Sequence, residues 1–489
     1  MTRRRACSCT DFVTSHASAG DGLPAIEPGM PLPAGTGLSR RSFLAKGIGL
    51  AMTVYGLDRL SAIDFDPGIA QAASSNRVVV SIFLDGGVDS LSALFPAGDG
   101  RYYDLRPTLA LPQSTGISFG EDPRLRWHPS LGALAQLHAE GKVSVIPAIG
   151  YTSPDKSHFT SRHYWEVGAT NAGLATGWLG RYLDRVGSAD NPLQGLSLDN
   201  RLQPALATAR MPVASIDGPD RYTFGASQRQ QESPLENRLL DALGELGAAH
   251  AGARDRAVRE VASAARQSHK LRRELRGLGA NVGQVPASYP QSADEFPRRL
   301  AGLAAMLAAG LPLRAVALKA PGMYDTHAEQ ADELTQALKL TADSILGFQR
   351  DVEARGLADR VLVQVWSEFG RRARENGSDG TDHGAAGLGL LIGTRVRGRM
   401  IGEFPGLASG LDEQGNVRAT ASPVAQPPSV AHSASNFGPA ARWMAPSTPP
   451  PPRIRLLAAL TTASTCWAVM SPSTTSISMD RASHDPQIK

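Results

Sequence analysis

Polar side chains of the types that bind metal ions follow four apolar stretches of this 489-residue chain. Aspartate and histidine bind divalent metals, and two metals a few ångströms apart can hold the attacking and leaving oxygens of an ester. A hydroxyl placed between them would act as the nucleophile. The chemistry indicated is metal-assisted ester hydrolysis. The four groups are Asp85 and Asp89; Ser153, Asp155, Ser157, His158 and His163; Asp325 and His327; and Glu368, Arg371, Asp382 and His383.

Each of these residues also has a purely structural interpretation. Asp85, followed by two glycines, is typical of an Asx-type turn. Asp325 and the residues after it can cap the helix expected next in the chain. His158 can pack in a core, and Arg371 can face water. The convergence of four loops on one place is what favours a shared site.

The apolar stretches that precede the polar groups have the pattern of buried parallel strands. Three of them follow segments with helical periodicity, which predicts an α/β fold with a mostly parallel sheet. Ligands of such sheets gather at the carboxyl ends of the strands. The expected strands are 77–87, 142–151, 314–320 and 361–366, and the expected helices are 131–142, 296–310 and 334–356. We therefore expect the metal ligands Asp85, Asp325, His327, Glu368, Asp382 and His383 to lie close together, with Ser157 and His158 nearby.

The loop after the fourth strand, SEFGRRARENGSDGTDHG, is expected to be a functional loop rather than a solvated turn. Gly377, Gly380 and Gly384 lie at short intervals along it. Glycine permits the positive φ values that a tight return of the backbone toward Asp85 would require.

Arg371 in the same loop has two interpretations. Its planar guanidinium matches the oxygens of phosphate and sulfate, so it can bind an oxyanion of the substrate as a catalytic residue. Alternatively it forms a structural salt bridge with Glu368 or Asp382.

Charge and cysteine content exclude other classes. Lys plus Arg number 50 and Asp plus Glu 46, a net charge of +4 that does not favour nucleic acid or an anionic membrane as partner. The cysteines, Cys7, Cys9 and Cys466, lie near the ends of the chain. The core therefore holds neither a disulfide nor a cysteine-ligated metal.

The N-terminal region predicts export. SRRSFLAK at 39–46 is followed by the short apolar stretch GIGLAMTVYGL and by AQA at 70–72, which is the pattern of a twin-arginine signal. A basic surface helix is the alternative. The signal implies the twin-arginine (Tat) translocase as partner, a periplasmic or secreted location, and no membrane span in the mature chain.

The expected organisation has three parts. Residues 1–72 are an N-terminal extension with the signal, 73–420 form the α/β domain, and 421–489 are a Pro/Ser-rich tail, disordered or out of frame. Within the domain, residues 232–279 have helical periodicity with interspersed charges, which predicts a solvated helical insertion.

The motifs SRRSFL, FLDGGVDSL, HPSLGALAQLHAEGKVSVIPAIGY, SHF, YDTHAEQ, WSEFGRRARENGSDGTDHG and GLGLLIG resemble, in order and spacing, a bacterial exported family called domain of unknown function 1501. The resemblance covers roughly residues 39–420. The family is similar to the alkaline phosphatase and sulfatase superfamily, which implies a parallel sheet flanked by helices on both faces and two-metal hydrolysis of phosphate or sulfate esters.

The resemblance implies roles for individual residues. Asp85 takes the place of a metal-binding aspartate at the end of the first strand, and Ser157 that of a nucleophile beginning a helix. Asp382 and His383 match a T-x-D-H-G pattern, although the superfamily has its Asp-His pair directly after the strand. There this chain has Ser-Glu-Phe, so either Glu368 has taken over a ligand position or the loop folds back.

Two functions are expected from these observations. The first is an exported metal-dependent hydrolase of phosphate or sulfate esters with divalent metal ions as cofactors. The second is a non-catalytic protein of the same fold that binds a ligand or other exported proteins at the cell surface or in the periplasm.

Overall fold

The computed structural model describes residues 52–53, 77–218, 234–275 and 287–423. The expected signal motif and most of the expected C-terminal tail lie outside these residues. Two residues of the apolar stretch of the signal, Met52–Thr53, form strand β1. Within the described residues, no helix is long and apolar enough to cross a membrane.

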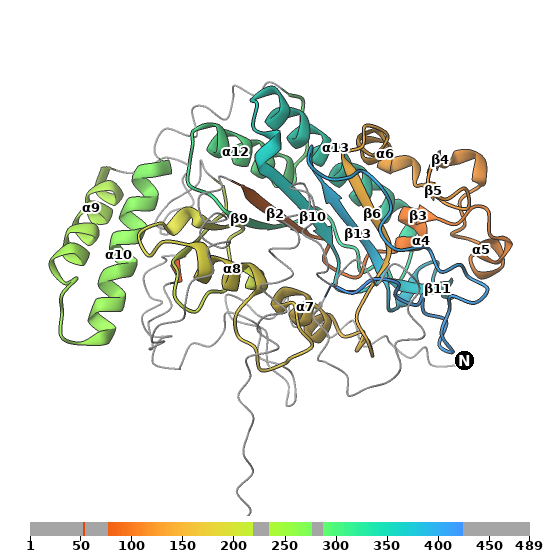
Figure 1. Cartoon of the computed structure of the whole chain (residues 1–489), viewed down its shortest axis with the longest axis horizontal. Helices are drawn as coiled ribbons and strands as arrows, with labels where there is room; N and C mark the ends of the chain where they lie inside the picture. The colour runs from red at the N-terminus through yellow and green to blue at the C-terminus, as the bar shows by residue number, and fades with distance from the viewer. Residues whose placement is uncertain (1–51, 54–76, 219–233, 276–286, 424–489) are drawn as a thin grey trace, which may run out of the picture.

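A mixed, mostly parallel sheet forms the centre of the molecule (Figure 1). Among the described residues it has eight strands in the order β1-β8-β7-β9-β2-β10-β13-β6. Their bounds are β1 Met52–Thr53, β2 Val78–Phe83, β6 Val143–Ile149, β7 Gly195–Leu198, β8 Val213–Ile216, β9 Ala315–Lys319, β10 Val361–Trp366 and β13 Gly387–Ile392.

The four strands expected from the sequence, now β2, β6, β9 and β10, are confirmed, and they all run in one direction. Strand β2 pairs in parallel with β9 and β10, while β13 is antiparallel to both β10 and β6, so β6 has the direction of β10. Strand β13 begins at the edge of the sheet where β10 ends, so it runs antiparallel to β10. The carboxyl ends of the four expected strands consequently share one edge of the sheet.

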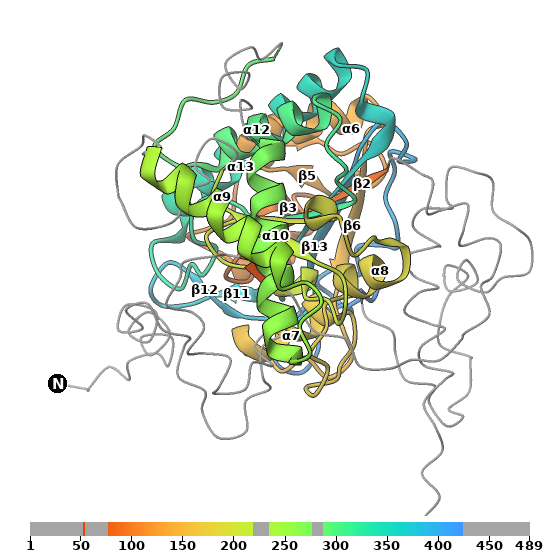
Figure 2. The same ribbon diagram turned by 90° about the vertical axis from the view of Figure 1, so that its left-hand side faces the viewer.

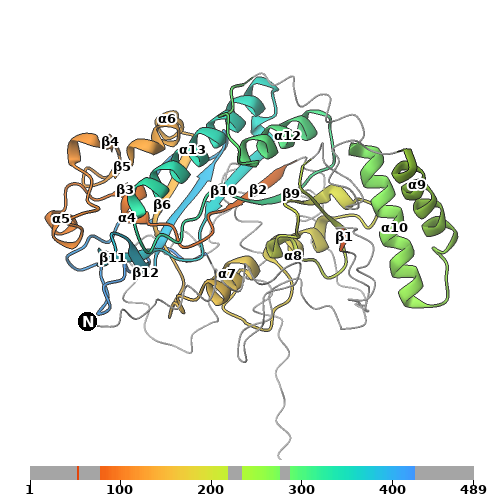
Figure 3. The same ribbon diagram turned by 180° about the vertical axis from the view of Figure 1, so that it is seen from behind.

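Helices cover both faces of the sheet, because alternate strand residues point to opposite faces (Figure 3). Val78, Val80 and Ile82 join the core that contains α6, α12 and α13. Val79 joins a second cluster with Leu179 of α8. The helices on the first face are α6 Gly132–Ala139, α12 Phe296–Ala308 and α13 Gln330–Ala354; those on the second are α7 His158–Val167 and α8 Trp178–Val186.

The expected insertion is a pair of packed helices, α9 Pro234–Ala249 and α10 Arg256–Leu275. The pair stands at the β1 end of the sheet, far from β6 (Figures 1 and 3), and it faces the viewer in Figure 2. Leu271 and Leu275 are buried on the inner face of α10, whereas Leu239 and Leu246 of α9 are exposed. The described part of this segment is thus two helices, with one face of α10 in the core.

The remaining elements are short. Strands β11 Arg371–Glu375 and β12 Thr381–His383 form a hairpin, and β3 Leu94–Phe95, β5 Arg126–Trp127 and β4 Ile117–Ser118 form a small sheet. Helices α4 Ser90–Ala93 and α5 Gly100–Leu105 adjoin them, and 3-10 turns are η2 Gln113–Thr115, η3 Pro129–Leu131, η4 Pro192–Gln194, η5 Pro204–Leu206 and η6 Ala358–Arg360.

Candidate metal centre

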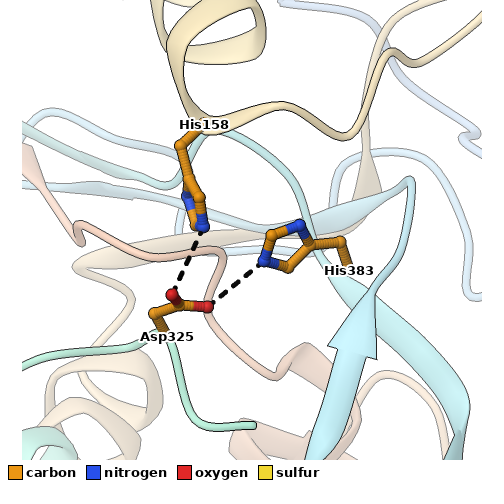
Figure 4. Close-up of side chains that lie close together, drawn as sticks. All are labelled: His158, Asp325 and His383. Carbon is orange, nitrogen blue, oxygen red and sulfur yellow. Dashed lines mark hydrogen bonds and ion pairs between the residues drawn. The ribbon is translucent and has the colours of Figure 1, made fainter. Parts of the chain in front are cut away.

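Loops from three strands bring His158, Asp325 and His383 together at the carboxyl edge of the sheet (Figure 4). His158 is the first residue of α7, which follows β6. Asp325 lies six residues beyond the end of β9, and His383 ends strand β12, which follows β10. One potential ligand atom from each of these residues lies within 4.8 Å of the others.

The carboxylate of Asp325 is the middle of the centre. Its Oδ1 lies 3.0 Å from Nε2 of His327 and 3.2 Å from Nε2 of His383. Its Oδ2 lies 3.4 Å from Nε2 of His158. The Nε2 atoms of His327 and His383 are 2.9 Å apart. Three potential ligand atoms therefore form a triangle with edges of 2.9–3.2 Å.

This triangle has the size of one face of a tetrahedral metal site. A zinc ion bound at about 2.0–2.1 Å to nitrogen and oxygen separates neighbouring ligand atoms by about 3.3 Å. Imidazole with a carboxylate is a ligand set for zinc and neighbouring transition metals, whereas calcium and magnesium prefer oxygen ligands alone. The residues present fit a zinc-class ion.

An oxygen atom faces the outer ring nitrogen of each histidine, so that Nε2 turns toward Asp325. Partners of this kind fix the tautomer and orientation of metal-binding histidines and are common around metal sites. The oxygens are Glu368 Oε1 at 2.7 Å from His158 Nδ1, the Lys156 carbonyl at 3.0 Å from His383 Nδ1, and Asp382 Oδ1 at 3.6 Å from His327 Nδ1.

Asp325 is held as an anion. Its burial alone would raise the pKa, but hydrogen bonds from His158, His327 and His383 and the charge of Arg371 hold the pKa of Asp325 far below its ordinary value. A metal ligand must be deprotonated, so this environment suits a carboxylate ligand.

The structure places Glu368 behind His158 rather than beside the other potential ligand atoms. Its fully buried carboxylate accepts hydrogen bonds from the backbone of Gly86 and Gly87, both at 3.0 Å, and from Ser367 Oγ at 2.9 Å. Gly86 and Gly87 have φ values of 125° and 73°, which L side chains rarely adopt, and these aim both N–H groups at Glu368. Glu368 therefore positions His158.

Of the two explanations for the displaced Asp-His pair, the structure shows that the loop folds back. Strands β11 and β12 form a hairpin in which Arg371 is paired with His383. Arg371 lies five residues after the end of β10. His383 thus returns close to the strand end, although more than a dozen residues separate it from Trp366.

The expected reason for the glycines of this loop is wrong. Positive φ occurs at Asp379, with φ 55°, and at none of the three glycines. Gly380 and Gly384 are instead required by close packing: a Cβ would lie 2.2 Å from the carbonyl carbon of His327 or 2.4 Å from that of Arg371. Gly377 lies in open space.

Arg371 is a fully buried positioning residue in this structure. All three of its guanidinium nitrogens donate to protein oxygens, and its salt bridge goes to Asp325 at 2.5 Å rather than to Glu368 or Asp382. The accepting carbonyls belong to Gly86, Gly87, Tyr324 and Thr381. This geometry fits the structural interpretation of Arg371, while a contact with a substrate oxyanion stays a prediction.

Asp85 and Ser157 lie beside the centre. Asp85 Oδ2 pairs with Lys319 Nζ at 2.7 Å. The structural role of the Asp85 side chain is therefore this ion pair rather than the Asx-type turn expected from the sequence. Ser157 is the N-cap of α7 and accepts a hydrogen bond from Thr160 N at 3.5 Å. It stands between Lys156, whose carbonyl contacts His383, and His158.

Other polar residues of the strand ends serve the fold. Asp89 forms a fully buried ion pair with Arg106 at 2.5 Å. His163 is buried and contacts the carbonyl of Asn171, and Ser153 and Asp155 are exposed in the loop before α7.

Two readings of single residues change with the structure. Asp325 does not cap the following helix, since α13 has Glu329 at its N-cap position. His158 was expected only near the site, and nothing in its local sequence but its position after Ser157 at the start of a helix indicates that it belongs to the centre.

Residues 113–451, more than half of the chain, match the family model described as Protein of unknown function (DUF1501). The chain belongs to the DUF1501 family. In this DUF1501 protein the matched residues include the whole of the candidate metal centre, whereas Asp85 and the export motif precede the match. No curated protein matches the chain.

Among solved structures, the crystal structure of Ps i-CgsB in complex with k-i-k-neocarrahexaose aligns with 66% of the DUF1501 protein and 68% of that chain. The sequence identity is 10% and the TM-score 0.28. A likeness at this level carries no argument about fold or function.

Proposed function

We propose that this DUF1501 protein is an exported, metal-dependent hydrolase of phosphate or sulfate esters, distantly related to the alkaline phosphatases and sulfatases. The observation that carries the proposal is the convergence of three histidine Nε2 atoms on the Asp325 carboxylate, each histidine having an oxygen behind its other nitrogen. Its position at the carboxyl edge of a mostly parallel sheet supports the distant relationship.

A zinc-class ion bound there would supply Lewis-acid stabilisation of the negative charge that develops on an ester oxygen. His158, Asp325, His327 and His383 would hold it. Arg371 neutralises Asp325 and ties it to the surrounding backbone.

Ser157 is the candidate nucleophile. Its hydroxyl begins α7 next to His158, and the amides at the start of a helix favour a negatively charged group. Its neighbours on both sides contact the centre, since the Lys156 carbonyl accepts from His383 and His158 faces Asp325. This position would place the hydroxyl against an ester bound at the centre.

The test compares bound metal and hydrolysis in four proteins. We expect the wild type and His250→Ala, a control at an exposed histidine after α9, to contain zinc-class metal and to cleave aryl phosphate or aryl sulfate esters. His383→Ala should lose metal and activity together. Ser157→Ala should keep the metal and lose at least a hundredfold in turnover, as expected for removal of a nucleophile.

Two outcomes would contradict the proposal. Full metal content in His383→Ala would show that the loop does not bind the ion. A wild type that binds no metal and cleaves no ester of the panel would favour the non-catalytic binding protein.

Export is the second part of the proposal and rests on the twin-arginine motif, which lies outside the described residues. Replacing Arg40 and Arg41 by lysine should retain the protein in the cytoplasm, because the translocase reads the paired arginines. Cell fractionation measures the result. Undiminished periplasmic accumulation of the double variant would refute this route.

A further inference from the structure

We propose that the centre holds a single divalent ion, and that the Lys319 ammonium beside Asp85 supplies the second positive charge met by an anionic ester. This inference rests on the proposed metal centre. It concerns the number of ions and the group that replaces the second one. The sequence contains enough carboxylates and imidazoles to bind two ions. In the structure, however, Asp85 pairs with Lys319, and Glu368 accepts hydrogen bonds from backbone amides and His158.

The first set forms the compact centre. Asp325, His327 and His383 have ligand atoms 2.9–3.2 Å apart, with His158 adjacent. Among the residues that the structure describes, no second group of three or more histidine, cysteine, aspartate or glutamate side chains has its ligand atoms within 4.8 Å of one another. One compact group indicates one ion.

Asp85, one of the carboxylates expected to bind metal, already has a cation. Lys319 is the last residue of β9, and the parallel register pairs it with Phe83 of β2, two residues before Asp85. This register brings Lys319 Nζ to 2.7 Å from Asp85 Oδ2. The pairing is therefore set by the sheet itself.

Arg162 adds a second cation near Asp85. Its guanidinium carbon is 4.5 Å from the centre of the Phe83 ring, and Phe83 is two residues before Asp85. Arg162 is fixed by an ion pair with Glu166 at 2.8 Å and lies over the ring of Phe83. A divalent ion at Asp85 would be repelled by the side chains of both Lys319 and Arg162.

Glu368 and Phe369, which lie near Asp85, do not supply ligand atoms for a second ion. Both oxygens of Glu368 accept hydrogen bonds from the protein. The next residue, Phe369, places an apolar ring against His158 and His383, with centroid distances of 5.0 and 4.7 Å. Neither Glu368 nor Phe369 is therefore placed to complete a second coordination sphere around Asp85.

The side chain of Lys319 stays 35% exposed at the carboxyl edge of the sheet. Asp85 connects this ammonium to the metal centre, because its side chain pairs with Lys319 at 2.7 Å and its carbonyl accepts a hydrogen bond at 3.0 Å from the backbone of Tyr324, the residue before Asp325. An anionic ester at the centre would meet the ion on one side and this ammonium on the other. A fixed cation of this kind stabilises negative charge without reorganisation.

The first experiment counts ions. Metal-free protein is loaded with excess zinc, freed of unbound zinc by gel filtration, and analysed for zinc per chain. We expect one equivalent in the wild type and one in Asp85→Asn when zinc is in excess. Two equivalents in the wild type, none in the wild type, or the loss of a whole equivalent in Asp85→Asn would each overturn the inference.

The second experiment measures binding of inorganic phosphate to the zinc-loaded proteins by calorimetry. Lys319→Met, which keeps the apolar stem but removes the charge, should bind phosphate at least tenfold more weakly at an unchanged zinc count. Lys319→Arg should retain most of the affinity. Wild-type phosphate affinity in Lys319→Met would overturn the role of the ammonium.

These readouts separate the inference from the proposed hydrolysis. One zinc equivalent with phosphate binding but no ester cleavage would refute the hydrolase and support the single-ion centre. Two zinc equivalents in an enzyme that cleaves esters would support the hydrolase and refute the single-ion centre.

Discussion

Replacing Arg371 with alanine is expected to destabilise the fold, because the side chain is fully buried and holds the loops of the centre together. It pairs with Asp325 and donates to four main-chain carbonyls from three separate segments of the chain. Removing one partner of a buried ion pair costs about 3–5 kcal/mol, and a buried carbonyl left without a donor costs about 1–3 kcal/mol. Because such costs do not add within one network, we expect a total loss of about 5 kcal/mol.

Thermal unfolding of the purified protein measures this loss. At about 2 °C per kcal/mol for a large domain, the midpoint of Arg371→Ala should fall by about 10 °C. Arg374→Ala is the matched control, since Arg374 lies on the same strand but is exposed, and it should change the free energy of unfolding by less than about 0.5 kcal/mol. An Arg371→Ala protein that melts like the wild type and loses only ester hydrolysis would show that Arg371 binds the substrate instead.

Three further outcomes are expected. Gly380→Ala should weaken zinc binding at least tenfold, because its Cβ would lie 2.2 Å from the carbonyl carbon of His327. Gly377→Ala, whose Cβ would lie in open space, should bind zinc as the wild type does. Equal zinc affinities of the two variants would refute this prediction. Arg106 holds the pKa of Asp89 below its ordinary 3.8 against the effect of burial, so the stability from this pair is present above that pH and is lost as the pH falls through the folded-state pKa. Urea unfolding between pH 3 and 7 should show this acid loss, and the loss should be smaller in Asp89→Asn, in which Asp85 and Asp325 still contribute their own acid dependence. Free zinc at a hundred times its Kd should raise the free energy of unfolding by about 2.7 kcal/mol, and an unchanged melting midpoint would argue against the centre.

Local patterns in the sequence determined the main elements and the edge of the sheet where the centre lies. Strands β2, β6, β9 and β10 are continuous apolar runs, because each is covered by helices on both faces, and such runs are visible without any tertiary contact. Polar residues that follow these runs must lie at one edge of a parallel arrangement. The expectation that Asp325, His327 and His383 lie together followed from this rule.

The same patterns did not predict β13, which runs antiparallel to β10. Its residues GLGLLI include two glycines, which weaken the pattern of a strand because glycine has no side chain to pack. Its direction follows from the hairpin loop, which starts and ends at one edge of the sheet.

Only the tertiary structure decided which polar residues at this edge touch one another. Lys319 reaches Asp85, and Glu368 reaches His158, through contacts between residues more than 200 positions apart in the chain. A histidine that begins a helix has the same local sequence whether it faces a metal centre or the core, so His158 could not be assigned from its neighbours. The roles divide according to strand register and side-chain packing, and these are set by long-range pairing that short-range patterns of hydrophobicity do not encode.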